Sequence, residues 1–68
     1  MLTEVQLETR WRHRDGNFYV IKGIFPWAES PTVPIIWYQD ELSGKDWCHF
    51  LKDFLQEKDG VKRFTQIS

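Results

Sequence analysis

The chain has 68 residues, with nine basic and ten acidic side chains and a formal net charge of −1 at pH 7. This length predicts one domain, residues 1–68, which buries only about 60% of the surface that its unfolded form exposes. The balanced charge excludes a global field that attracts nucleic acid or an anionic membrane. The chain has no run of about eighteen apolar residues, so no membrane span is predicted. The first residues do not resemble a signal peptide.

Aromatic side chains are the only obvious reinforcement for so small a core. The chain contains four Trp, two Tyr and five Phe, and each such side chain can bury roughly 150–250 Å². Cys48 is the only cysteine, so no disulfide forms within the chain, and one free thiol favours a reducing cytoplasm. Two His and one Cys without metal-ligand spacing predict neither a metal nor another cofactor.

The first part of the chain predicts a strand that follows a poorly patterned segment. A short edge strand is possible over residues 1–7, whose apolar members are Leu2, Val5 and Leu7. Residues 8–14 alternate as in a half-buried strand, with Trp11 and His13 on one face. The opposite face carries Arg10, Arg12 and Arg14.

A hairpin is expected next. Residues 15–17 read Asp-Gly-Asn and predict a tight turn, because Gly and Asn accept positive φ. Residues 18–25 are β-branched and aromatic on both faces, which predicts a central, bent strand. Gly23 marks the expected bulge or bend.

The middle of the chain predicts a loop followed by two strands. Residues 26–34 hold all three prolines and predict a long loop. A third strand is expected over residues 35–38 and a fourth over residues 46–49. Between them, residues 40–45 predict a turn with Gly44 at positive φ.

The C-terminal part is ambiguous at its start. Apolar residues recur at helical spacing over residues 50–55, which favours a single helical turn. A longer helix at about 48–57, packed on an antiparallel sheet, is the alternative. Asp59 and Gly60 predict a turn into a last strand over residues 61–67. Five short strands, tight turns and one helical turn predict a mainly β fold, a small SH3-like antiparallel barrel.

Several residues match the pattern of a known family. Residues 11–23 read Trp-Arg-His-x-x-Gly-x-x-Tyr-x-Ile-x-Gly, and looser matches continue to about residue 67. The chain thereby resembles a small bacterial and phage domain family of unknown function, whose pattern starts aromatic-Arg-His-x-x-Gly-x-x-Tyr-x-Val-x-Gly. The resemblance implies a compact, mostly β domain and no activity. The chain departs from the family at Trp27, Tyr38 and at His49 with the following Phe.

The aromatic residues predict either a contact surface or simply the core. One concave face is expected to carry Trp11, His13, Tyr19, Trp37 and Trp47. Aromatic faces with polar tips serve peptides, nucleobases and small planar ligands. Trp27 in the proline-rich segment is an exposed contact or a lid, and Arg12 and His13 are expected as polar anchors.

Catalysis and nucleic-acid binding are the competing interpretations. Cys48 and His49 are adjacent in a predicted strand and point to opposite faces, so they cannot act as nucleophile and base. A pair of Cys48 with His13 has no evident orienting group, and Cys48 is expected to be buried and inert. The basic stripe of Arg10, Arg12 and Arg14 could follow phosphates while aromatic rings stack bases, although a solvated strand face explains it as well.

The sequence therefore predicts a non-catalytic binding or adaptor module. Its partner is expected to be a protein or peptide, because Trp and Tyr are enriched at interaction hot spots. A phage-derived protein that targets a host protein would be one such module. Nucleic-acid or nucleotide binding is the alternative. Open strand edges allow a monomer or a weak homodimer.

Overall fold

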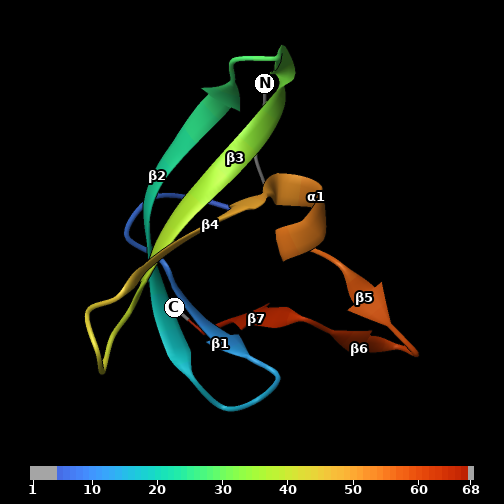
Figure 1. Ribbon diagram of the computed structural model, residues 1–68. Helices are drawn as coiled ribbons and strands as arrows, with labels where there is room; N and C mark the ends of the chain where they lie inside the picture. Colours follow the sequence, from blue (N-terminus) through green and yellow to red (C-terminus); the bar gives the residue numbers. More distant parts are fainter. Residues whose placement is uncertain (1–4, 68) are drawn as a thin grey trace.

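The computed structural model describes residues 5–67, and this part of the chain is mainly β, as predicted (Figure 1). In chain order the elements are β1 (Arg10–His13), β2 (Phe18–Trp27), β3 (Ser30–Asp40), β4 (Asp46–Phe50), α1 (Leu51–Phe54), β5 (Glu57–Lys58), β6 (Val61–Lys62) and β7 (Phe64–Gln66). The predicted edge strand over residues 1–7 lies partly outside the described residues, and residues 5–7 are not a strand.

The strands form one antiparallel sheet and one small hairpin. β1 to β4 follow each other as a meander, and after α1 the chain returns so that β7 pairs with β1. The sheet order is β4-β3-β2-β1-β7, which leaves β4 and β7 at its edges. β5 and β6 pair only with each other and project from one side of the molecule (Figure 1).

The first turn confirms the local prediction. The His13 N–H donates to the Asn17 carbonyl at 2.8 Å, and the Gly16 N–H donates to the His13 carbonyl at 2.8 Å. Gly16 has φ 102°, which costs a residue without Cβ little. The Asp15 carboxylate accepts from the Asn17 N–H at 3.0 Å, an Asx-type contact that explains why Asp precedes the turn.

The predicted loop over residues 26–34 is wrong, because β2 and β3 continue as one long hairpin. Pro26 lies opposite Pro34, Trp27 lies opposite Ser30, and only Ala28 and Glu29 form the connection. The two neighbouring strands do not reach this end of the hairpin, since β1 pairs only with residues 18–20 of β2 and β4 only with residues 35–39 of β3. A proline whose nitrogen faces an open edge removes no ladder hydrogen bond, so strands tolerate it there.

The bulge predicted at Gly23 is present and lies directly before it. The register changes from Ile21 opposite Tyr38 to Gly23 opposite Trp37, so Lys22 is the extra residue. A Cβ on Gly23 would lie 2.7–2.8 Å from the Phe25 ring and 2.9 Å from the Trp37 ring. Glycine is thus required here by the close approach of two aromatic side chains.

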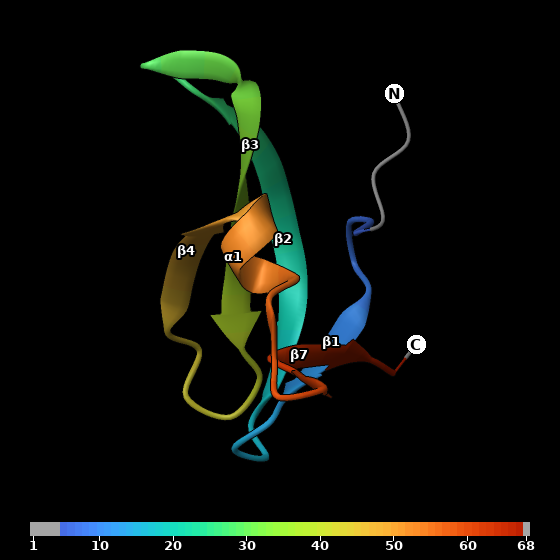
Figure 2. The same cartoon turned by 90° about the vertical axis from the view of Figure 1, so that its right-hand side faces the viewer.

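The core lies between one face of the sheet and α1 (Figure 2). We call this face the inner face, and the opposite one the outer face. Phe54 of α1 stacks on Phe64 of β7 with ring centroids 4.1 Å apart, and it meets Trp11 and Tyr38 edge-on at 5.2 and 5.4 Å. The buried apolar residues are Val5, Trp11, Tyr19, Ile21, Ile36, Tyr38, Phe54 and Phe64.

The helical turn predicted over residues 50–55 is confirmed, and the longer helix at about 48–57 is wrong. Only residues 51–54 are helical, because the preceding five residues pair with β3 as β4. The predicted last strand over residues 61–67 is interrupted at Arg63. The Arg63 N–H donates to the Gln56 carbonyl at 2.9 Å, and its carbonyl accepts from the Arg14 N–H at 3.0 Å. The chain therefore leaves the small hairpin and joins the main sheet at this residue.

Candidate binding surface

The five residues predicted to line one concave face do not share a face. Trp11 and Tyr19 are core residues, with only 6% and 8% of their surfaces exposed. Their burial follows from position, since they lie opposite each other in β1 and β2, where Phe54 and Phe64 cover the sheet. These two residues offer almost no surface to a partner.

His13 and Trp47 lie on the rim of the core. His13 meets the Phe64 ring edge-on at 4.8 Å, and its Nδ1 lies 3.0 Å from an Asp15 carboxylate oxygen. Trp47 is 42% exposed, and the Lys45 ammonium lies 4.6 Å from the centre of its ring. Trp37, by contrast, lies on the outer face, opposite Gly23 and Cys48.

Trp27 and Trp37 contribute to a different surface, which we call the hairpin patch. Cross-strand partners share a face of a sheet, and the outer face carries one row of partners across β2, β3 and β4. The members of the hairpin patch are Phe25, Trp27, Ile35, Trp37 and Phe50.

The rings of the hairpin patch pack on one another and still face solvent. Phe25 stacks on Trp37 with centroids 6.3 Å apart, and Trp27 meets Phe50 edge-on at 5.1 Å. Phe25 is 51% exposed and Trp27 is 37% exposed. The Trp37 indole N–H donates to an Asp46 carboxylate oxygen at 3.1 Å, which orients that ring. The patch is therefore a preorganised aromatic surface with a polar margin.

A hollow near the end of the hairpin shares only Phe25 with the hairpin patch, because the pairs Ile24–Ile36 and Pro26–Pro34 belong to the inner face. Its volume is about 410 Å³. The lining residues are Ile24, Phe25, Pro26, Pro31, Thr32 and Pro34. Apolar hollows flanked by exposed rings suit an apolar side chain of a partner.

Sequence reasoning missed Phe25, Ile35 and Phe50 as members of the surface. A signal for Phe25 was available, because Gly23, Phe25 and Trp27 alternate along one strand and share a face. The predicted loop over residues 26–34 concealed it. The membership of Phe50 depends on pairing with Ile35, a contact that spans distant parts of the sequence.

The arginine stripe lies at the other end of β2 from the hairpin patch. Arg12 is exposed opposite Phe18 in β1–β2 pairing, so it cannot anchor a ligand held at Phe25 and Trp27. Arg10 binds Glu41 through two hydrogen bonds of 2.6 and 2.9 Å. The Arg10 side-chain hydrogen bonds lower the pKa of Glu41, so this pair stays charged at neutral pH. One of the three cations is thereby already neutralised.

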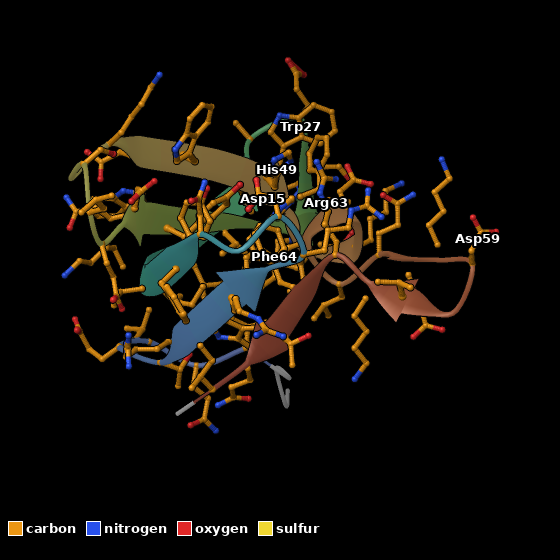
Figure 3. The ribbon with its side chains drawn as sticks, turned by 90° about the horizontal axis from the view of Figure 1, so that it is seen from below. Asp15, Trp27, His49, Asp59, Arg63 and Phe64 are labelled. Carbon is orange, nitrogen blue, oxygen red and sulfur yellow. The ribbon has the colours of Figure 1, made fainter. Side chains whose placement is uncertain are left out.

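A second group of polar residues lies at the margin of the core, where Figure 3 labels His49, Arg63 and Phe64. The His49 ring stacks on Tyr38 with centroids 5.8 Å apart. Burial lowers the pKa of His49, the nearby Arg63 cation lowers it further, and Asp53 acts in the opposite sense. Burial also raises the pKa of Tyr38 to about 12. These shifts favour a neutral His49 and a neutral Tyr38 at pH 7.

Cys48 is exposed, which corrects the prediction of a buried thiol. It lies opposite Trp37 on the outer face, whereas His49 lies opposite Ile36 on the inner face. The two side chains therefore point to opposite sides of the sheet, as predicted. Within residues 5–67, no three His, Cys, Asp or Glu side chains are grouped so that they could hold a metal ion.

Comparisons with protein families, with curated proteins and with solved structures found no match to this chain. Within the described part of the chain, no helix has the length and apolar character needed to cross a membrane.

Proposed function

We propose that this protein is a non-catalytic binding module that recognises an apolar segment of a partner protein or peptide through the hairpin patch. The observation that supports this most is the exposure of Phe25 and Trp27, at 51% and 37%, on the outer face of the sheet. Contiguous exposed apolar surface of this kind is typical of interaction sites. Rigid aromatic side chains bind at low conformational cost and dominate hot spots.

The proposed mode of recognition uses side chains rather than strand addition at the hairpin end. Pro26 of β2 and Pro34 of β3 lie opposite each other there, and Pro31 precedes Pro34 in β3. Proline cannot donate to an added strand, so a partner would dock on the exposed rings of the outer face.

We also propose an SH3-like arrangement, a cytoplasmic location and kinship with the small bacterial and phage domain family. The meander with a return of β7 to β1 after a helical turn is consistent with an SH3-like arrangement, and the bend at Gly23 would begin its closure. The single thiol favours the cytoplasm. Kinship with the small bacterial and phage domain family rests on the motif at residues 11–23, and a phage-derived protein that targets a host protein would have this form.

Nucleic-acid binding is the less supported alternative. The positive charge of the arginine stripe is reduced because Arg10 is paired with Glu41. The net charge of −1 supplies no long-range attraction for nucleic acid. Arg12 and Arg14 remain exposed on their strand face.

The test is a selection of random displayed peptides on the protein, followed by titration of the selected peptides into isotope-labelled protein. We expect the largest amide shifts at Phe25, Trp27 and Ile35. Phe25→Ala should weaken binding at least about tenfold, since a hot-spot truncation costs about 1.4 kcal/mol or more.

Phe18→Ala is the matched control, because Phe18 is a 40% exposed Phe at the opposite end of β2. It should leave peptide affinity unchanged. Equal losses for the two variants would contradict the proposed surface. Shifts confined to Arg12 and Arg14 on titration with oligothymidylate, with steep salt dependence, would support the nucleic-acid alternative instead.

A further inference from the structure

The second feature that fits a partner is the edge of β4, which pairs with no strand other than β3 among residues 5–67. All five residues of β4, Asp46–Phe50, pair with β3 in an unbroken register. β4 lies at the margin of the sheet order, and Figure 2 shows it at the edge of the ribbon. An edge strand presents unpaired N–H and C=O groups that can accept another strand.

The directions of these backbone groups follow from two hydrogen bonds of β3. The Asp40 N–H donates to the Lys45 carbonyl at 2.9 Å, towards β4, whereas the Glu41 N–H donates to the Phe18 carbonyl at 3.0 Å, towards β2. Successive residues of a strand alternate in this way. The residues of β4 that bond β3 are thus Trp47 and His49, and those turned to the open edge are Asp46, Cys48 and Phe50.

The other edges of the sheet carry features that hinder strand addition, whereas the only such feature in β4 is the charge of Asp46. β7 has only three residues, Phe64–Gln66, and begins where Arg63 interrupts the strand. The open flanks of the β2–β3 hairpin carry Pro26, Pro31 and Pro34. β4 has no proline and no lysine, and its register with β3 contains no bulge. Natural edges that remain unpaired usually carry such protection.

We propose that β4 pairs antiparallel with β4 of a second copy of this chain, around a two-fold axis at Cys48. This is the register in which every residue of the strand finds a partner. It places Cys48 opposite the partner's Cys48 and both Asp46 residues opposite Phe50 of the other copy. Each of these three facing pairs has its backbone turned to the open edge and can exchange two hydrogen bonds.

The side chains are compatible with this register. Trp47 lies opposite the partner's His49 on the inner face, twice by symmetry, and cross-strand aromatic pairs stabilise antiparallel strands. The exposed ring of Trp47 would be covered in this way. The only charge within the strand, Asp46, meets an apolar side chain of the other copy rather than a like charge. A second copy thus fits the edge by backbone direction, by ring pairing and by charge.

This pairing would also join the outer faces of two copies into one continuous sheet. Phe50 belongs to the hairpin patch and ends β4, so the two patches would flank the symmetry axis. Two linked patches bind a two-site partner more tightly than one. The dimer does not depend on the proposed function, since it requires only the edge of β4.

The test is sedimentation velocity of the full chain from micromolar to millimolar concentration. We expect a reversible monomer–dimer equilibrium. Cys48→Pro removes the central donor without touching a β3 bond and should raise the dimer dissociation constant at least about tenfold. Cys48→Ser keeps the donor and should leave the constant unchanged. Cys48→Lys keeps the donor, places like charges opposite each other, and should also weaken the dimer.

Amide hydrogen exchange identifies the interface and does not require any variant to fold. On going from dilute to concentrated protein, we expect slower exchange at Asp46, Cys48 and Phe50 and unchanged exchange at Trp47 and His49. A chain that stays monomeric at millimolar concentration would overturn the proposal. A dimer with no added protection at Cys48 would also overturn it, by assigning association to another surface.

Discussion

The two ends of the β2–β3 hairpin use aromatic side chains in opposite ways. At the end that pairs with β1, the rings of Tyr19, Tyr38 and Phe64 meet edge-on within 5.1–5.8 Å and are buried. At the projecting end, Phe25 and Trp27 also contact other rings but remain substantially exposed. The difference comes from the face of the sheet. Tyr19 and Tyr38 lie on the inner face, which α1 covers (Figure 2), whereas Phe25 and Trp27 lie on the outer face. Aromatic content alone therefore does not identify a contact surface.

The largest expected loss of stability comes from a change in the buried core. Phe54→Ala should destabilise the protein by about 3–5 kcal/mol, because it removes a fully buried ring and leaves a cavity. A domain of this length has roughly 3–10 kcal/mol of stability in total, so the variant should be largely unfolded. Circular dichroism and denaturant titration measure this. Phe25→Ala, from the exposed end, is the comparison, and similar losses for both variants would refute the distinction between the two ends.

An intermediate effect is expected at the boundary between the ends, at Gly23. Gly23→Ala should cost about 1–2 kcal/mol, because the added methyl overlaps the rings of Phe25 and Trp37. Denaturant midpoints measure the loss. The double variant with Phe25→Ala should recover part of it, since the exposed ring is then gone. No recovery in the double variant would place the strain in the overlap with Trp37 or in the backbone of the bulge instead.

A smaller effect on stability is expected at the exposed end. Trp27→Ala should cost about 1 kcal/mol or less, because its main aromatic contact is one edge-on pair with Phe50. The same change should abolish binding of peptides selected on the hairpin patch. Denaturant titration and peptide titration on the same sample separate the two effects. A large loss of stability would assign Trp27 to the core.

The smallest expected effect is a pH dependence from His49. Its pKa is lowered on folding, mainly by burial, so the unfolded chain takes up the proton first. The stability that the neutral His49 contributes should be fully present above the unfolded pKa of about 6.5. It should decline as pH falls below that pKa towards the lower pKa of the folded state. Denaturant midpoints between pH 7.5 and about 5.5 should fall, and His49→Gln should flatten this slope.

The lower pH limit of about 5.5 excludes the titration of the Asp15 and Glu41 carboxylates from this measurement. Hydrogen bonds lower the pKa of Asp15 and of Glu41, so their contribution is lost only in more acidic solution. An unchanged slope in His49→Gln would assign the pH dependence to another group.

Local sequence determined most of the turns and the class of the fold. Asp15 and Gly16, Gly44 at φ 75°, and Gly60 at φ 77° lie in turns as predicted, because positive φ is a property of single residues. The bend at Gly23 and the helical turn after Phe50 were also predictable. Each of these features depends on residues within one turn of the chain.

The candidate surface was predictable only in part. Trp27 and Trp37 were predicted contacts and do reach the hairpin patch, whereas Trp11 and Tyr19 are core residues. The loop over residues 26–34 was wrong because the effect of a proline on a strand depends on whether a neighbouring strand needs its N–H. That neighbour lies elsewhere in the sequence.

What the sequence by itself determined is a small, aromatic-rich β domain with its turns in place, because alternation and positive φ are local properties. Only the tertiary structure decided which rings are buried and which edges are open. Burial depends on where α1 and β4 lie against the long hairpin and where β7 lies against β1. These contacts join residues that are not neighbours in the chain, such as Ile35 with Phe50 and Trp11 with Gln66. The physical reason is that a side chain has no inside or outside until its neighbours are placed.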